Sequence, residues 1–360
     1  MKIAINIPII SKEEITAVTS VLKNATLTSS TNQGGKYVQD FEKSAASFVK
    51  SKYAVAVNSG TAALQAALYA LDIKTGDEVL VPSFTFVATA NAVVSTGAKP
   101  IFVDILKENY TIDPDDLQKK ITKKTRAIIP VHLYGNVAHM EKLSEIAKKH
   151  NLPIIEDSAQ SLGSIYKGKY TGTFFEMGCY SMYPAKVMTA GEGGFIVTNS
   201  KKLRDKLLMI RNHGMIHGYD TRIFGLNLRL PEISAAIATV QMKKLPNFLK
   251  SRKKNAELLS KLLSDLKVVL PHQRKNENVN WYLYTIATEK RDKLLRKLNE
   301  KGIGAVSYYP TPIHKTPFYK LTTKLPVTDW AASHVVSLPI HPKVSQKNIE
   351  FIAKTMREIL

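Results

Sequence analysis

Between Tyr53 and Asn199, short apolar runs alternate with amphipathic stretches, and this alternation restricts the chain to few folds. The runs predict strands at Ala54–Val57, Glu78–Pro82, Pro100–Asp104, Ala127–Leu133, Pro153–Asp157, Gly178–Tyr183 and Phe195–Asn199. Helices are predicted among them at Thr61–Leu71, Thr85–Ser95, Asp113–Ile121 and Met140–His150. Continuous Val- and Ile-rich strands between helices are typical of βαβ units with a buried, mostly parallel sheet. We therefore predict an α/β fold with any ligand at the edge where the strands end.

The regions on either side of this stretch are mainly helical. Ahead of it, helices are predicted at Ser11–Lys23 and Tyr37–Lys50, and Ser11 with Glu14 forms a capping-box signature. Behind it, the pattern predicts helices Lys201–Arg211, Pro231–Lys244 and Leu245–Leu266, strand Val279–Thr288, helix Arg291–Lys301, strand Gly304–Tyr308 and helix Gln346–Ile359. A chain of 360 residues suits two domains. We expect a large domain over 1–244 and a smaller C-terminal α/β domain over 245–360.

Composition narrows the class of protein. No apolar run reaches 18 residues, so we expect no membrane-spanning helix, and the N-terminus lacks the cleavage site of a signal peptide. The single cysteine, Cys179, cannot form an internal disulfide, which favours a cytoplasmic location. The net charge of +21 comes from short, dispersed basic clusters. We expect no nucleic-acid partner, because such a partner usually meets a basic tail or stripe.

Lys186 is unusual among the many lysines because its neighbours are apolar. Pro184 and Val187 flank it, and a glycine-rich turn, Gly191–Gly194, follows. Desolvation lowers the pKa of a lysine, which is the condition for a nucleophilic amine that forms Schiff bases. Local sequence alone favours the other interpretation, a lysine whose charged end extends into solvent.

Other polar groups follow the predicted strands. Gly60 and Thr61 begin a helix, whose free N–H groups can bind an anion or simply be capped by Ser59. Asp157 ends an apolar strand, where a buried carboxylate needs a partner such as a protonated pyridine nitrogen, although a helix-capping role also fits. Gln160 follows it and can bind a phenolic oxygen.

Two further residues complete this edge. Phe84 follows another strand and can stack on a flat ligand, although a core position also suits a phenylalanine. Ser181 lies five residues before Lys186. Together these groups comprise an amine, an acid, an aromatic ring and an anion site, which is the equipment that a pyridoxal phosphate enzyme requires.

No arrangement of histidines indicates a metal site. His213 and His217 have the i,i+4 spacing of a helical pair, but Gly214 and Gly218 follow them directly and argue against a helix. His132, after another predicted strand, fits a hydrogen-bonded structural histidine. We therefore expect no bound metal.

The ordered motifs resemble the DegT/DnrJ/StrS sugar aminotransferases, a family of fold-type I pyridoxal phosphate enzymes. The resemblance runs from Pro8 to His314. It is carried by NSGTAAL at 58–64, VPSFTFVATA at 81–90, GAKPIFVD at 97–104, IPVHLYG at 129–135, EDSAQ at 156–160, SMYPAK at 181–186, GEGG at 191–194 and GLNLR at 225–229.

The resemblance implies a role for each matching residue. Lys186 is expected to bind pyridoxal 5'-phosphate as a Schiff base and to move the proton, and Asp157 to pair with the pyridine nitrogen. The remaining implied cofactor contacts are Gly60, Thr61 and Ser181 at the phosphate, Gln160 at the ring 3-oxygen, Phe84 on the ring face, and Asn227 from the other subunit of a homodimer. Tyr309 and His314 are implied near the sugar.

The resemblance also implies the substrates: a nucleoside-diphosphate-linked keto-sugar, for which we expect a 4-keto-6-deoxy sugar, and glutamate as amino donor. Relatives that replace the lysine by histidine dehydrate sugars, and others were viewed as regulatory proteins. The presence of Lys186, Asp157 and Gln160 argues against both alternatives. Two departures from the family pattern are Met182, in place of the common phenylalanine, and the loop Thr28–Gly35.

Overall fold

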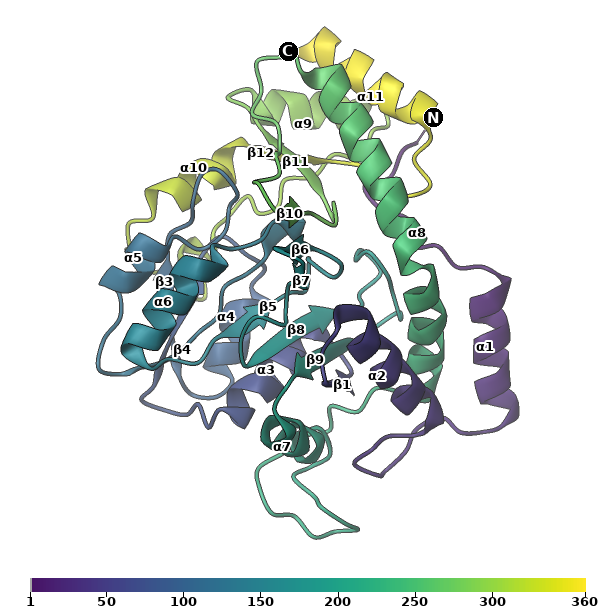
Figure 1. Ribbon diagram of the computed structural model, residues 1–360. Helices are drawn as coiled ribbons and strands as arrows, with labels where there is room; N and C mark the ends of the chain where they lie inside the picture. The colour runs from purple at the N-terminus through teal and green to yellow at the C-terminus, as the bar shows by residue number, and fades with distance from the viewer. Residues whose placement is uncertain (1) are drawn as a thin grey trace.

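The structure is a computed structural model that describes residues 2–360 (Figure 1). Its helices are α1 (Lys12–Lys23), α2 (Lys36–Val49), α3 (Gly60–Ala70), α4 (Ala88–Val94), α5 (Pro114–Lys119), α6 (Met140–His150), α7 (Lys201–Arg211), α8 (Glu232–Leu263), α9 (Arg291–Glu300), α10 (Pro326–His334) and α11 (Gln346–Ile359). Its strands are β1 (Tyr53–Val57), β2 (Glu78–Pro82), β3 (Lys99–Val103), β4 (Thr125–Ile128), β5 (Ile155–Asp157), β6 (Ile165–Tyr166), β7 (Lys169–Tyr170), β8 (Met177–Ser181), β9 (Gly194–Thr198), β10 (Glu277–Asn278), β11 (Tyr284–Ala287) and β12 (Val335–Leu338).

The central sheet is mostly parallel, as the sequence predicts. One part has the order β1-β9-β8-β5 and the other the order β3-β2-β4. Parallel bridges from Ile128 to Ile154 and from Val131 to Asp157 join the two parts. Only β9 runs against its neighbours, β1 and β8. The carboxyl ends of β5 and β8 therefore lie at the same edge of the sheet, where Asp157 pairs in register with Cys179.

Both faces of this sheet are buried, which explains why its strands have continuous apolar sequences. Alternate residues of β1 face opposite sides. Ala54 and Ala56 belong to a core that includes α2 and part of α8, whereas Val55 and Val57 belong to a core that includes α3 and α7. The buried helix α3 is rich in alanine, so it can pack closely on the strands.

The C-terminal unit is built on the antiparallel pair of β11 and β12, covered by α9, α11 and the end of α8. The prediction of two helices between Pro231 and Leu266 is wrong, because α8 is one helix of 32 residues with Pro246 inside it. Figure 1 shows α8 passing from the central sheet to this unit. The proposed domain boundary, between residues 244 and 245, falls inside α8 and stays a prediction. Ile3, at the other end of the chain, joins the core of the C-terminal unit.

Smaller differences concern short elements. The predicted strand at Gly304–Tyr308 is reduced to one bridge, between Val306 and Ser337. The two-residue strands β6, β7 and β10 and the α10–β12 segment were not predicted. The capping box of Ser11 and Glu14 is confirmed.

Candidate active site

Lys186 lies in the loop that joins β8 to β9, at the carboxyl edge of the sheet. Its backbone N–H donates to the carbonyl oxygen of Tyr183 at 2.8 Å, which makes a turn of the segment. The loop closes with Gly193 and Gly194. A Cβ atom on Gly194 would lie 2.5 Å from the carbonyl oxygen of Ser59, so glycine allows β9 to pass next to the start of α3.

The side chain of Lys186 is partly buried, and its Nζ lies 4.8 Å from the centre of the Tyr282 ring. Burial lowers the pKa of this lysine from 10.5 to about 8, against the opposing effect of the Asp157 carboxylate. An ammonium group is disfavoured where water is excluded, so the neutral amine becomes accessible near neutral pH. Lys186 therefore has the nucleophilic character that its apolar neighbours predict.

Asp157 is the last residue of β5 and is 4% exposed. Its carboxylate accepts hydrogen bonds from Thr89 Oγ1 at 2.8 Å and from the backbone N–H of Ala159 at 3.1 Å. Burial raises its pKa, and these hydrogen bonds and Lys186 act in the opposite direction. The structure thus brings a buried carboxylate and a partly neutral amine to the same edge of the sheet. Thr89 was not identified from the sequence; it lies on α4, one turn after the PSFTF motif.

Glu156 points to the opposite side of β5 from Asp157. Its carboxylate accepts from the backbone N–H groups of Gly172 at 2.6 Å, Phe174 at 2.7 Å and Phe175 at 3.1 Å. It also lies 3.1 Å from His132 Nε2, and both side chains are fully buried. His132 is therefore a structural histidine, as the sequence predicts, and Glu156 holds a loop.

Gln160 bridges two elements at this edge. Its Oε1 accepts from the backbone N–H of Tyr134 at 2.8 Å, and its Nε2 donates to Tyr309 OH at 3.2 Å. The side chain is buried beside Asp157 on the segment that leaves β5. Tyr309, which was expected near the sugar, is thereby brought to the same edge.

Gly60, Thr61 and Ser181 lie together beside the start of α3. A Cβ atom on Gly60 would lie 2.8 Å from Ser181 Cβ, so the absence of a side chain permits this approach. Ser59 Oγ accepts from Ala62 N–H, which leaves the earlier N–H groups of the helix available. These free N–H groups, next to the β8 strand that leads to Lys186, are available to bind an anion, as the sequence predicts.

The predicted ring-stacking residue, Phe84, is fully buried. Its ring centre lies 6.3 Å from those of Tyr110 and Tyr309, and it has no exposed face for a ligand. Phe86, two residues later in the same motif, is 55% exposed, and its ring centre lies 6.1 Å from that of Tyr309. The geometry therefore favours Phe86 over Phe84 as the aromatic contact, and the bend of the backbone at residues 83–85 turns the two rings in different directions.

His314 is also fully buried. Its Nδ1 lies 2.7 Å from Ser83 Oγ, and its backbone N–H donates to the same oxygen at 3.1 Å. Burial lowers the pKa of the imidazole. His314 thus connects the segment around residue 314 to Ser83, which follows β2. This buried environment supports a structural role more than contact with a sugar.

Asn227 is exposed and lies in the segment 212–231 that joins α7 to α8. Figure 1 shows a loop of this segment, called here the projecting loop, extending from the molecule after α7. Its backbone carbonyl accepts from Asn58 Nδ2 at 3.3 Å, so it lies near the start of its own α3. The unusual loop Thr28–Gly35 packs against the projecting loop, because Asn32 Nδ2 donates to the carbonyl of Met215 at 2.5 Å. These two loops border a groove of about 730 Å³.

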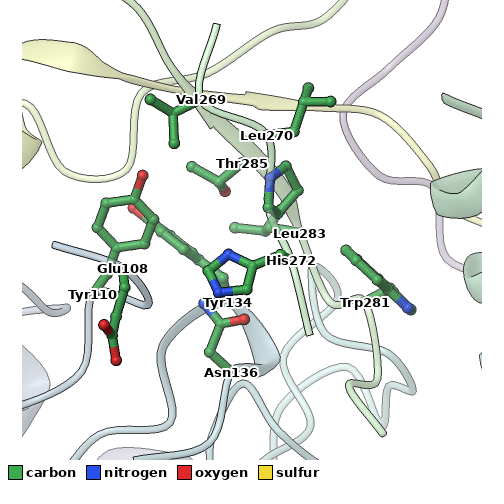
Figure 2. Close-up of a pocket in the computed structure, with 11 residues that line it drawn as sticks. Glu108, Tyr110, Tyr134, Asn136, Val269, Leu270, His272, Trp281, Leu283 and Thr285 are labelled. Carbon is green, nitrogen blue, oxygen red and sulfur yellow. The ribbon is translucent and has the colours of Figure 1, made fainter. Parts of the chain in front are cut away.

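A small cavity lies where Tyr110 and Tyr134 meet the C-terminal unit. Figure 2 shows these two rings on one side and Val269, Leu270 and Leu283 on the other. Its volume is about 20 Å³, enough for one water molecule and too small for a cofactor. Across residues 2–360, no group of three His, Cys, Asp or Glu side chains could hold a metal ion, and no helix is long and apolar enough to cross a membrane.

Known proteins similar to this chain are aminotransferases and related proteins of one family. A sequence model of the DegT/DnrJ/EryC1/StrS aminotransferase family matches residues 8–357. One relative is the "Pleiotropic regulatory protein" of Geobacillus stearothermophilus, 39% identical over 90% of this chain and 89% of the relative. Another is the "dTDP-3-amino-3,4,6-trideoxy-alpha-D-glucose transaminase" of Streptomyces venezuelae, 37% identical over 96% and 93%. The solved structure of S. venezuelae DesV is 36% identical, with a TM-score of 0.92 over 96% of this chain and 94% of that chain.

The fold and the match define a pyridoxal phosphate-dependent aminotransferase of fold-type I. The chain belongs to the DegT/DnrJ/EryC1/StrS aminotransferase family and is a sugar aminotransferase. The residues at the sheet edge fit pyridoxal phosphate. Asp157 offers a buried carboxylate without a cation in ion-pair contact among residues 2–360, and the missing side chain of Gly60 allows Ser181 to lie close to the start of α3.

Proposed function

We propose that the protein transfers an amino group from glutamate to a nucleoside-diphosphate-linked keto-sugar, with a 4-keto-6-deoxy sugar as the substrate. The observation that carries the proposal is Lys186, with its lowered pKa, electrostatically coupled to the buried Asp157. The name of the S. venezuelae relative, a transaminase of a dTDP-linked sugar, supports a nucleotide-linked substrate. The single cysteine, Cys179, is buried and unpaired, which supports a cytoplasmic location.

Lys186 and Asp157 have complementary roles in this proposal. Bound pyridoxal phosphate supplies an electron sink and carries the amino group between the two substrates. The Lys186 amine would hold the cofactor through its aldehyde and would move the proton at the substrate carbon, for which a pKa near neutrality is suited. The Asp157 carboxylate, held by Thr89 and Ala159, would keep the pyridine nitrogen protonated. Gln160 would orient the ring through its 3-oxygen.

The remaining residues are assigned to the phosphate and the ring face of the cofactor and to the sugar. The N–H groups of Gly60 and Thr61 and the Ser181 hydroxyl bind the phosphate. Phe86 is assigned the stacking role in place of Phe84, because only Phe86 has an exposed ring. Tyr309 is kept as the proposed sugar contact, and His314 is proposed to position the segment that carries it through Ser83.

The proposed active form is a homodimer. The projecting loop exposes Ile216 by 40%, Tyr219 by 98% and Phe224 by 61%, and apolar exposure on this scale is typical of an interaction surface. The loop leads directly into Asn227. We assign the partner's Asn227 to the phosphate site. Accordingly, Asn227→Ala should weaken cofactor binding, as measured by titration of the cofactor-free protein, whereas an unchanged affinity would remove Asn227 from the site.

Visible absorption tests the proposed reaction. Wild-type protein mixed with pyridoxal phosphate should show the absorption band of lysine-bound cofactor, and glutamate should remove that band. Lys186→Ala should lack the band. A wild-type protein that shows no such band, or a band that glutamate leaves unchanged, would contradict the proposal and favour a non-catalytic role.

The sugar specificity requires a second assay. Nucleotide-linked 3-keto and 4-keto sugars would be supplied separately to the glutamate-treated protein, and recovery of the original band would be followed. We expect recovery with a 4-keto-6-deoxy sugar. Recovery with 3-keto sugars alone would correct the position of amination without affecting the class of reaction.

A further inference from the structure

Arg252, on α8, is a buried cation without an acidic partner. Its side chain is 3% exposed, and no Asp or Glu among residues 2–360 forms an ion pair with it. Burial lowers its pKa to about 10, so the guanidinium remains charged at neutral pH. Burying an unpaired charge is unfavourable, and its neutral partners must therefore hold it in a defined position.

These partners come from two distant parts of the chain. Arg252 Nη1 donates to the carbonyl oxygen of Tyr282 at 3.0 Å and approaches that of Trp281 at 3.4 Å. Its Nη2 donates to Asn6 Oδ1 at 2.9 Å. Asn6 belongs to the N-terminal segment, residues 3–10. This segment is hydrogen-bonded to the C-terminal unit at Ile3 and Ala4 and to α8 at Ile9.

Both partners lead to Lys186. Asn6 Nδ2 donates to the carbonyl oxygen of Pro184 at 2.9 Å, two residues before the lysine in the β8–β9 loop. The Tyr282 ring lies 4.8 Å from Lys186 Nζ. Asn6, Lys186 and Arg252 line a common cavity of only about 10 Å³, so the space behind the lysine is almost completely filled.

We propose that Arg252 is a positioning residue for Lys186. Through Asn6 it fixes the backbone of the loop that carries the amine, and through the carbonyl of Tyr282 it fixes the aromatic ring beside the amine. The inference rests on the proposed role of Lys186 as the amine that binds the cofactor. Arg252 itself touches neither cofactor nor substrate in this assignment.

Loss of the Arg252 contacts should change the pKa of Lys186 in a definite direction. The titratable groups on the elements around it are Asp157 on β5, Tyr183 on its own loop, Tyr282 before β11, Tyr308 and Tyr309 after α9, and Arg252 on α8. Burial, the first cause of the lowered pKa, depends on the packing of the loop and the Tyr282 ring. If the anchor is lost, water reaches Nζ and its pKa moves upward toward 10.5.

The test uses the full-length protein without cofactor. Acetylation of Lys186 is measured by peptide mass spectrometry as a function of pH, which gives the titration midpoint of this amine directly. Wild type should titrate near pH 8. Arg252→Met and Asn6→Ala should each raise the midpoint by about one unit, which is a tenfold smaller neutral fraction at pH 7.

Asn255→Ala provides a matched control. Asn255 is a buried residue on the same helix and donates to the backbone carbonyls of Ile340, His341 and Val344, and not to Asn6, Tyr282 or the β8–β9 loop. This variant should lower the melting temperature but keep the wild-type midpoint. Arg252→Lys keeps the charge but cannot span both acceptors, so it should also raise the midpoint.

Several results would overturn the inference. If Arg252→Met and Asn6→Ala fold and Lys186 keeps its wild-type acetylation midpoint in both, Arg252 serves only stability. If Arg252→Met does not fold, the midpoint measured in Asn6→Ala decides the question. A wild-type midpoint in Arg252→Lys would show that charge alone suffices. The proposed function fails separately, if wild type does not bind pyridoxal phosphate, because the acetylation midpoint needs no cofactor.

Discussion

Asp157 and Glu156 are adjacent acids with opposite environments, and they should respond differently to substitution. Glu156 accepts three backbone hydrogen bonds and contacts His132, so Glu156→Ala should lower the free energy of unfolding by about 3 kcal/mol. Asp157 has a raised pKa, so its ionisation opposes folding. Asp157→Asn should leave the cofactor-free protein as stable as wild type but weaken cofactor binding. Denaturant unfolding measures the stability of each variant, and titration measures its cofactor binding. Equal losses of stability in Glu156→Ala and Asp157→Asn would contradict the different roles assigned to the two acids.

The lowered pKa of Lys186 predicts how cofactor uptake depends on pH. Only the neutral amine attacks an aldehyde, so the rate of cofactor binding should rise between pH 7 and 9 with a midpoint near 8. The same shift affects stability. The folded form releases this proton at lower pH than the unfolded chain, so this group makes the cofactor-free protein more stable as pH rises from about 8 to 10.5. A binding rate that first rises above pH 10 would contradict the pKa.

At the scale of elements, α1 is attached to α8 by a buried charge cluster. Glu14 is 1% exposed and accepts from Lys244 Nζ at 2.8 Å and from Gln241 Nε2 at 2.7 Å. Burial alone would raise its pKa, but Lys244, Ser11 and Gln241 outweigh burial and lower the pKa from 4.5 to about 2. This attachment orients α1 beside the N-terminal segment that carries Asn6.

Removing the cation should therefore detach α1. Lys244→Met leaves a buried carboxylate unpaired and should cost about 3 kcal/mol of unfolding free energy at pH 7. The native pairing contributes fully above pH 4.5 and is lost as pH falls through about 2, so the difference from wild type should shrink in acid. Lys243→Met, an exposed neighbour, is the control and should unfold like wild type. An equal effect of the two substitutions would rule out the pairing.

The elements also show what sequence patterns can and cannot reveal. The strand runs of the central sheet were predictable because both faces are buried, and the polar residues at their ends mark the site. Phe84 was misassigned because apolar residues at alternate positions do not reveal which one is exposed. Arg252, Asn6 and Tyr282 were missed, since their link to Lys186 depends on contacts between residues far apart in the sequence. The chain from Glu232 to Leu263, for which two helices were predicted, is the single helix α8, because it packs on two cores.

At the scale of the whole molecule, the projecting loop predicts the oligomeric state. If Tyr219 lies in a dimer interface, Tyr219→Asp should convert the protein to monomers and weaken cofactor binding, because the phosphate site would lose the partner's Asn227. Phe318→Asp is the control, since Phe318 is 74% exposed but does not belong to the projecting loop. Sedimentation velocity separates the two forms. Dimers that persist in Tyr219→Asp would place the interface elsewhere.

The N-terminal segment also has a consequence for synthesis on the ribosome. The backbone of Ile3 pairs with that of Ile303, and the carbonyl oxygen of Ala4 accepts a hydrogen bond from His341. The Asn6 side chain accepts a hydrogen bond from Arg252. These residues leave the exit tunnel long before their partners, and they find those partners only after much more of the polypeptide has been translated. Nascent chains that already contain Lys186 and Asp157 would still lack the support behind the lysine, so competence for cofactor capture arrives only after Arg252 and Tyr282 have been translated.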